Sequence, residues 1–154
     1  MEERGLDMEK ELLKKGPVLD EKGRPIPGYS RKSTLVYDRK AIKAPAWRIK
    51  EWDFYQISNE RLCLQFTIGH AAYAGQVSLM LFDFIKGEKL LDLNKILVLP
   101  FGSLHMPTDA EKDNTLSYEK GGVLMRFQTK NQKRVLTCRW GNVEVKIQIG
   151  RAHV

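Results

Sequence analysis

Four side chains that can donate or accept a proton lie within one stretch of the chain: Glu51, Asp53, His70 and Tyr73. Glu51 and Asp53 flank Trp52, so an extended strand would place both carboxylates on one face, about 7 Å apart. Two carboxyl groups in different environments can divide acid and base roles. His70 and Tyr73 can each exchange a proton with a bound ligand. These four are the candidate catalytic residues for a hydratase-like or isomerase-like reaction on an apolar substrate.

Each of these residues also has a structural interpretation, which the sequence favours. Glu51 and Asp53 can form salt bridges with the neighbouring basic stretch. His70 and Tyr73 can simply close a turn. The aromatic residues of the region can fill a core or line a hydrophobic cavity. If they line a cavity, the candidate ligand-binding residues are Trp47, Trp52, Phe54, Tyr55 and Tyr73.

Other chemistry has no signature in the sequence. Cys63 and Cys138 are the only cysteines, no CxxC motif occurs, and three scattered histidines form no metal pattern. There is no phosphate-binding loop, no GxGxxG motif and no Ser-His-Asp or Cys-His arrangement. We therefore expect no metal and no cofactor.

The chain is basic, with 26 Lys and Arg against 19 Asp and Glu, a net charge of +7. Residues 31–50 hold seven basic side chains and one acid, Asp38. This segment suggests a third function, a basic module that contacts nucleic acid or anionic lipid. No aromatic–basic motif of an RNA-binding sheet is present, so we expect no specific nucleic-acid partner. A solvated surface with a basic bias explains the charge equally well.

The length of 154 residues suits one domain with a real core. The start has no apolar stretch of signal-peptide type, and no run approaches the roughly 18–20 apolar residues of a membrane span. With two free thiols, the expectation is a cytoplasmic protein. The sequence gives no oligomeric state.

Three segments follow one another along the chain. Residues 1–16 form a helical segment, with a helix expected over residues 6–15 that ends at Gly16-Pro17. Residues 17–46 form an arm rich in Pro and Gly, followed by the basic segment. Residues 47–154 are expected to form a β-barrel or a β-sandwich.

The first hairpin, over residues 52–68, has two possible registers around the turn at Asn59. A three-residue loop pairs Ser58 with Leu62 and leaves the carboxylates off the apolar face. A two-residue loop places Glu51 and Asp53 on that apolar face, with Arg48 or Lys50 as possible counter-ions. Because buried carboxylates without partners are costly, we favour the first register. The final hairpin is clearer, since the turn at residues 141–142 pairs Trp140 with Val143 and Arg139 with Glu144.

The overall pattern is all-β, with seven or eight strands in hairpin succession and no αβ alternation. It predicts an antiparallel up-and-down meander forming a barrel or a sandwich. The strand over residues 76–84 is apolar on both faces, so we expect cover on both. Residues 100–122 are expected to form a long loop over the mouth of a pocket. The favoured function is therefore binding of a small hydrophobic ligand or a lipid.

Several segments resemble domain-of-unknown-function family 2804. They are PIPGYS at 25–30, LVYDRKAIKA at 35–44, WRIKEWDFYQISN at 47–59, TIGHAAYAGQVSLMLFDF at 67–84 and HMPTDAEKDNTLSY at 105–118. The resemblance covers residues 17–127. It implies a lipocalin-like β architecture, distantly similar to carotenoid hydratases, and it implies no established activity.

The sequence departs from the family in two respects. The stretch Gly69-His70-Ala71-Ala72 replaces a more polar turn, which weakens any role carried over to that turn. Family members are also longer and have a second β domain. A pocket between two such halves would be incomplete in this chain.

Overall fold

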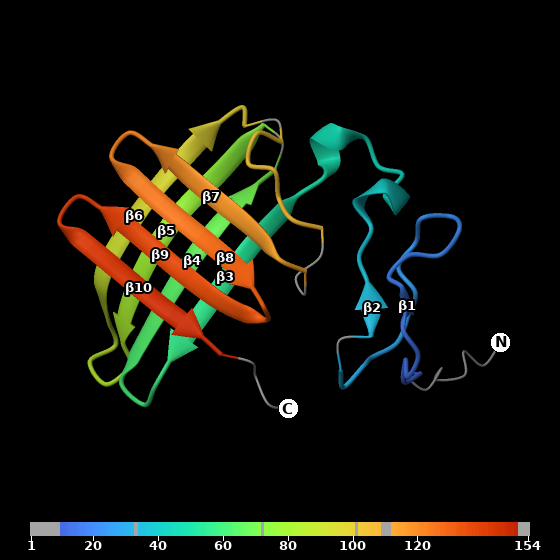
Figure 1. Cartoon of the computed structure of the whole chain (residues 1–154), viewed down its shortest axis with the longest axis horizontal. Coiled ribbons are helices and arrows are strands. Elements are labelled where there is room, and N and C mark those ends of the chain that lie inside the picture. The colour runs from blue at the N-terminus through green and yellow to red at the C-terminus, as the bar shows by residue number, and fades with distance from the viewer. Residues whose placement is uncertain (1–9, 33, 72, 101, 109–111, 151–154) are drawn as a thin grey trace, which may run out of the picture. The chain divides into compact units, whose positions relative to one another are not determined.

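The computed structural model describes residues 10–32, 34–71, 73–100, 102–108 and 112–150. The chain divides into two compact units, residues 1–43 and 44–154. The larger unit holds eight strands that form two four-stranded antiparallel sheets, in the orders β3-β4-β5-β6 and β10-β9-β8-β7. In Figure 1 the strands of one sheet lie over those of the other and cross them. The strands are β3 Glu51–Ser58, β4 Leu62–His70, β5 Ala74–Asp83, β6 Glu88–Val98, β7 Asn114–Lys120, β8 Val123–Lys130, β9 Lys133–Trp140 and β10 Val143–Ile149.

The core of this unit lies between the two sheets. Alternate residues of each strand face inward, because successive side chains of a strand point to opposite faces. Phe66 of β4 contacts Phe127 of β8 edge-to-face, with ring centroids 6.3 Å apart, and so links the sheets. The other fully buried apolar side chains are Ile68, Val77, Leu79, Leu116, Met125 and Leu136.

The all-β, antiparallel prediction is confirmed for this unit, and its sheets are not closed into a barrel. The predicted N-terminal helix is wrong over residues 10–15, and residues 6–9 lie outside the described part of the chain. Glu11 forms a parallel bridge with Tyr29, and the Leu12 amide donates to the Tyr29 carbonyl. A helix of about ten residues is marginal in water by itself, so pairing with a neighbouring segment prevails here.

The smaller unit, taken by itself, has little regular structure. Its strands β1 Gly16–Pro17 and β2 Leu35–Val36 pair in parallel. The chain turns after Asp20, where the Asp20 carboxylate accepts from the amides of Lys22 and Arg24. Gly23 takes a positive φ of 76° within that turn. Two short 3-10 turns follow in the chain, η1 Arg39–Ala41 and, in the larger unit, η2 Ala46–Arg48.

The final hairpin matches its prediction residue for residue. Val143 pairs with Trp140, and Glu144 pairs with Arg139. Gly141 has a positive φ of 59°, which the tight turn requires and glycine adopts at little cost. Turn chemistry and the alternation of apolar side chains agree in this segment, so its register follows from the sequence.

The favoured register of the first hairpin is wrong. Ser58 pairs with Cys63, so four residues, 59–62, lie between the last two paired residues of the hairpin. The Asn59 side chain sets this longer connection, since its Oδ1 accepts from the amides of Arg61 at 2.9 Å and Leu62 at 2.7 Å. The shift by one residue turns Glu51 and Asp53 to the inner face. It turns Trp52 to the outer face.

The predicted long loop over residues 100–122 is also wrong in its second half. Strand β7 begins at Asn114 and pairs with β8 throughout its length. Leu116 and Tyr118 face the core, which gives β7 the inward alternation of a half-buried strand. In the preceding connection, Leu104 and Met106 are buried in the same core. This connection therefore covers one end of the core.

None of the described residues belongs to a helix with the length and apolar character needed to cross a bilayer.

Candidate functional site

The register of the first hairpin brings two of the four candidate catalytic residues into contact. Glu51 pairs with His70 across β3 and β4, and Glu51 Oε2 lies 3.4 Å from His70 Nε2. Their side chains are only 12% and 7% exposed. A carboxylate beside a shielded imidazole can hold a protonated imidazole as an ion pair or orient a neutral one. The pair can therefore hold or transfer a proton.

Asp53 lies two residues further along the same inner face, opposite Ile68. Burial raises the pKa of the Asp53 carboxyl, and the charge of Arg134 offsets part of that rise. Burial also raises the pKa of Tyr55, and the Asp53 carboxylate raises it further. The Arg134 guanidinium lies over the Tyr55 ring, 5.6 Å from its centroid. Arg134 of β9 is therefore the basic group whose charge lowers the pKa of Asp53, in place of the expected Arg48 or Lys50.

The remaining candidates lie apart from this cluster. Tyr73 belongs to the connection between β4 and β5 and is 55% exposed. Trp47 lies in η2 and is 64% exposed. Tyr55 faces the core and packs edge-to-face on Phe127, with ring centroids 4.9 Å apart. The candidate ligand-binding aromatics thus occupy four separate places, since Trp52 and Phe54 face outward from β3.

The outer face of the β3–β6 sheet carries a groove of ≈ 400 Å³ beside Trp52. We call it the Trp52 groove. Four residues paired across the sheet explain the shape of the groove. Trp52 on β3 and Ile96 on β6 have large side chains, whereas Gly69 between them has no side chain and Gln76 is polar. Trp52 and Ile96 are 66% and 65% exposed, so both stand above the sheet as walls. The groove is lined by Lys50, Glu51, Trp52, Thr67, Gly69, His70, Ala71, Ala74, Gly75, Gln76 and Ile96.

Gly69 sets the depth of the Trp52 groove. A Cβ atom at this position would lie 2.7 Å from Trp52 Cβ and 3.1 Å from the Glu51 carbonyl oxygen. Neither atom is the end of a flexible side chain, so only glycine allows β3 to approach β4 this closely at the Trp52 pair. The same absence of a side chain leaves the floor of the groove open.

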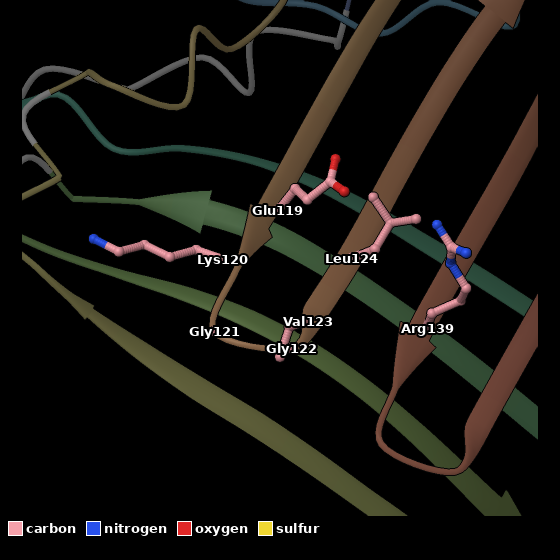
Figure 2. A pocket seen from close by; sticks show the side chains of 7 residues that line it. All are labelled: Glu119, Lys120, Gly121, Gly122, Val123, Leu124 and Arg139. Atoms are coloured by element: carbon pink, nitrogen blue, oxygen red, sulfur yellow. The ribbon is translucent and has the colours of Figure 1, made fainter.

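Two further hollows lie elsewhere in the larger unit. One, of ≈ 380 Å³, adjoins the β7–β8 turn and Arg139. Figure 2 shows the side chains of Glu119, Leu124 and Arg139 pointing to the same side of the sheet beside it. The other, of ≈ 610 Å³, lies between the edges of β6 and β7 and is lined by residues 95–100, 103–104 and 117–121.

The two cysteines do not form a reactive site. Cys63 and Cys138 are both free and are 1% and 0% exposed. Burial raises the pKa of the Cys138 thiol to about 11, which disfavours the thiolate. Among the described residues, no three His, Cys, Asp or Glu side chains are grouped closely enough to hold a metal ion.

Sequence reasoning missed most of the Trp52 groove and the role of Arg134. Ile96, Gln76 and Thr67 come from three strands, and they share a surface with Trp52 only through three successive registers. Arg134 reaches Asp53 and Tyr55 from the other sheet. The sequence held one signal for the groove, because Thr67 and Gln76 are polar residues among the apolar residues of their strands. Polar residues in such positions can form the floor of a groove.

Comparison with known proteins gives one match. A family model described as "Domain of unknown function (DUF2804)" matches residues 9–153. No curated protein and no solved structure matches the chain.

Proposed function

The chain belongs to the DUF2804 family, and we propose that it binds a small, largely apolar molecule or a lipid chain in the Trp52 groove. The groove itself supports this proposal most directly. Its volume of ≈ 400 Å³ lies within the roughly 300–1,000 Å³ typical of small-molecule sites. Apolar walls with a few polar groups on the floor are the usual composition of such sites.

The exposed indole of Trp52 supplies the driving force for binding. Two thirds of this side chain is exposed. A ligand that covers it removes on the order of 100 Å² of apolar surface from water, worth about 2 kcal/mol. Thr67 and Gln76 can hydrogen-bond a polar group of the ligand, which would fix its orientation on the floor. The interior of the sandwich is a less suitable place, because the side chains that face it fill a shared core.

Ligand titration tests the proposal with a matched pair of variants. Trp52→Ala and Trp47→Ala remove the same side chain at nearly equal exposure, 66% and 64%, and only Trp52 lines the groove. The probes are anilinonaphthalene sulfonate, followed by fluorescence, and oleate as its competitor. We expect Trp52→Ala to weaken probe binding by about 30-fold, the equivalent of about 2 kcal/mol. Equal weakening by both variants would contradict the groove as the site.

A second candidate function rests on the Glu51–His70 contact. Both residues border the Trp52 groove, and their side chains meet on the inner face of the sheet, behind the floor of the groove. We propose a hydratase-like or isomerase-like activity as the reaction this pair would support. A distant relationship between this chain and the carotenoid hydratases is part of the same proposal.

Isotope incorporation tests this activity. Lipid extracted from the purified protein is returned to it in heavy water or in ¹⁸O-labelled water and examined by mass spectrometry. Isomerisation through proton transfer introduces deuterium, and hydration introduces ¹⁸O. Glu51→Gln and His70→Gln should remove incorporation, whereas Tyr73→Phe should retain it because Tyr73 lies apart from the pair. Incorporation that persists in His70→Gln would exclude this site.

The third function, a basic module over residues 31–50 that contacts nucleic acid or anionic lipid, stays a prediction. Lys43 in the smaller unit donates to the Glu21 carbonyl, and Lys40 is exposed.

A further inference from the structure

The hollow of ≈ 610 Å³ between β6 and β7, which we call the β6–β7 hollow, contains a lysine with neutral contacts only. Lys95 pairs with the fully buried Val77 on β5, so its side chain leaves β6 on the inner face. Its Nζ donates to the Lys120 carbonyl at 3.3 Å and lies 5.7 Å from the centroid of the Tyr118 ring. In the part of the chain that the structure describes, no carboxylate forms an ion pair with it. Lysine has three N–H donors, so this half-buried ammonium group can still donate to an anion.

Gly121, in the turn between β7 and β8, leaves space for this ammonium group. A Cβ atom at Gly121 would lie 2.7 Å from Lys95 Nζ. Gly121 also has a positive φ of 62°, which glycine adopts at little cost in a tight turn. The ammonium group therefore lies at the turn end of the hollow, beside residues that are exposed to solvent.

The rest of the hollow is largely apolar along β6 and the residues that follow it. This part is lined by Leu97, Val98, Leu99, Pro100 and Leu104. Leu104 is 7% exposed, whereas Val98 and Leu99 are 79% and 56% exposed, so apolar surface continues from the interior to the rim. Leu99 has a φ of 52°, a left-handed conformation that is uncommon outside glycine, and its amide donates to the Tyr73 carbonyl. Strained backbone of this kind is concentrated at binding sites, and here it holds an apolar side chain at the rim.

The separation of the cation from the apolar residues fits a short amphipathic molecule. Leu97 and Leu99 lie two and four residues beyond Lys95, which corresponds to about 7 and 13 Å along an extended strand. With carbon–carbon bonds of about 1.5 Å, an alkyl chain of roughly six to ten carbons covers this distance. Ser117 and Tyr118 of β7 also line the hollow.

Glu119 limits the charge of such a molecule. It also lines the hollow, but its side chain belongs to the outer face of β7, where its carboxylate lies 3.5 Å from Arg126. One ammonium group inside and one carboxylate at the border favour a ligand with a single negative charge, because like charges repel.

We propose that the β6–β7 hollow binds a small amphipathic carboxylate, with its carboxylate on the Lys95 ammonium group and its alkyl chain against Leu97 and Leu104. A carboxylate is a stronger acceptor than the carbonyl that Lys95 contacts now, since hydrogen bonds between charged groups are about twice as strong as neutral ones. The alkyl chain removes the exposed apolar surface of the rim from water. The hollow and the Trp52 groove share only Ile96 among their lining residues, so this proposal does not depend on the ligand of the groove.

Three probes with the same alkyl chain and different head groups test the proposal: octanoate, 1-octanol and octylamine. At pH 7 the first is an anion and the last a cation. Isothermal titration calorimetry measures their affinities, and amide chemical shifts locate the contact. We expect octanoate to bind about tenfold more tightly than 1-octanol, because a hydrogen bond to a charged group is lost with the alcohol. Octanoate should shift the amides of residues 95–99 and 117–121, and octylamine should not.

Two variants separate the charged end of the site from its apolar end. Lys95→Met keeps an apolar stem and should remove the preference for octanoate over 1-octanol. Leu99→Gly suits the left-handed backbone and should weaken both probes by a similar factor of about five, with the preference retained. Lys146→Met is the matched control for lost charge, since Lys146 is exposed on β10 and does not line the hollow. Trp52→Ala should leave the shifts at residues 95–99 unchanged, which distinguishes this site from the groove.

Three results overturn the proposal. The first is equal affinity of octanoate and 1-octanol for the unmodified protein. The second is a set of amide shifts that lies away from residues 95–99 and 117–121. The third is a Lys95→Met variant that loses stability in urea but keeps the preference, which would show that Lys95 only ties β6 to the turn after β7. If Lys95→Met does not fold, the probe affinities of Leu99→Gly and the shift map of the unmodified protein decide.

Discussion

The two sheets of the larger unit share one core but present opposite outer faces to solvent. The outer face of the β7–β10 sheet is polar, and the outer face of the β3–β6 sheet has large exposed apolar side chains. On the polar face, Arg126 lies 3.5 Å from Glu119. The outward residues of this face are Glu119, Leu124, Arg139, Glu144, Ser117, Arg126, Thr137, Lys146, Thr115, Gln128, Val135 and Gln148.

The β3–β6 sheet inverts this arrangement. Its edge strands hold the exposed apolar side chains, Trp52 and Phe54 on β3 and Ile96 and Val98 on β6. Beside the groove its central strands hold Thr67, Gly69, Gln76 and Ser78, of which Ser78 is only 2% exposed although it faces outward. Scattered apolar residues are normal on a surface, but large ones that flank a small polar floor produce a groove. The proposed binding site therefore lies on the sheet with exposed apolar side chains, and the other sheet presents a mainly polar surface.

Substitution of the shared core should affect both sheets alike. Phe66→Ala on β4 and Phe127→Ala on β8 each remove a buried ring and should each cost about 3–5 kcal/mol of unfolding free energy. The rings touch, so the double variant should cost less than the sum. Urea denaturation of the three variants measures this. Additive costs would show that the two sheets are stabilised independently.

Gly69→Ala tests how tightly the apolar face is built. The new Cβ would meet Trp52 Cβ at 2.7 Å, so β3 must shift, and we expect a loss of about 1–3 kcal/mol. The Trp52 groove should lose probe binding at the same time. Gly150→Ala is the matched control, because a Cβ there has no heavy atom within 4 Å. If both variants unfold at the same urea concentration, the close approach of β3 to β4 does not constrain the groove.

The sequence was informative where local chemistry and alternation agreed. The Trp140–Val143 hairpin is the example, because glycine fixed the turn and one face was uniformly apolar. The register predicted for the first hairpin is wrong because both faces of this hairpin carry aromatic residues. The alternation of apolar and polar side chains therefore did not distinguish between registers. The decisive group was the Asn59 carboxamide, whose hydrogen bonds to Arg61 and Leu62 lengthen the connection.

The candidate site was predictable in part. The sequence singled out Glu51 and His70 separately, and their contact follows only from the register. The cost of burying two carboxylates disfavours any register that turns both inward, as long as partners distant in sequence are left out of account. His70 accompanies Glu51, and Arg134 of the opposite sheet accompanies Asp53. Cross-sheet partners of this kind cannot be read from one strand.

Asp53→Asn tests the inner face of β3 through its pH dependence. Burial raises the folded-state pKa of Asp53 above the ordinary value of 3.8. The unfolded chain therefore releases this proton at a lower pH than the folded protein does, and the contribution of Asp53 to stability falls as the pH rises from 3.8 through the folded pKa. The asparagine variant lacks that loss, so its stability relative to the unmodified protein should increase from about pH 3 to about pH 7.

Urea denaturation at several pH values measures this difference, which we expect to be smaller than the Gly69 effect because Asp53 keeps partial contact with water. Asp92→Asn is the control for an exposed carboxylate, since Asp92 lies on the outer face of β6 with its Oδ2 2.6 Å from Lys89 Nζ. Stability curves for Asp53→Asn and the unmodified protein that stay parallel across this range would show that Asp53 is as well solvated in the folded state as in the unfolded chain.

The smallest effect is expected on the polar face. Arg139 lies opposite Glu144 on β10 and beside Leu124 on β8, and it is exposed. Exposed cross-strand ion pairs contribute about 0.2–1 kcal/mol, so Arg139→Ala should reduce the unfolding free energy by no more than that. Part of the loss should disappear in high salt, since salt screens exposed charges. Urea denaturation at low and high salt separates the ionic part of this loss of unfolding free energy from the part that comes from packing of the arginine stem beside Leu124. A salt-independent loss above about 2 kcal/mol would show that the stem holds Leu124 in place, and the polar face would then be a packed layer like the groove side.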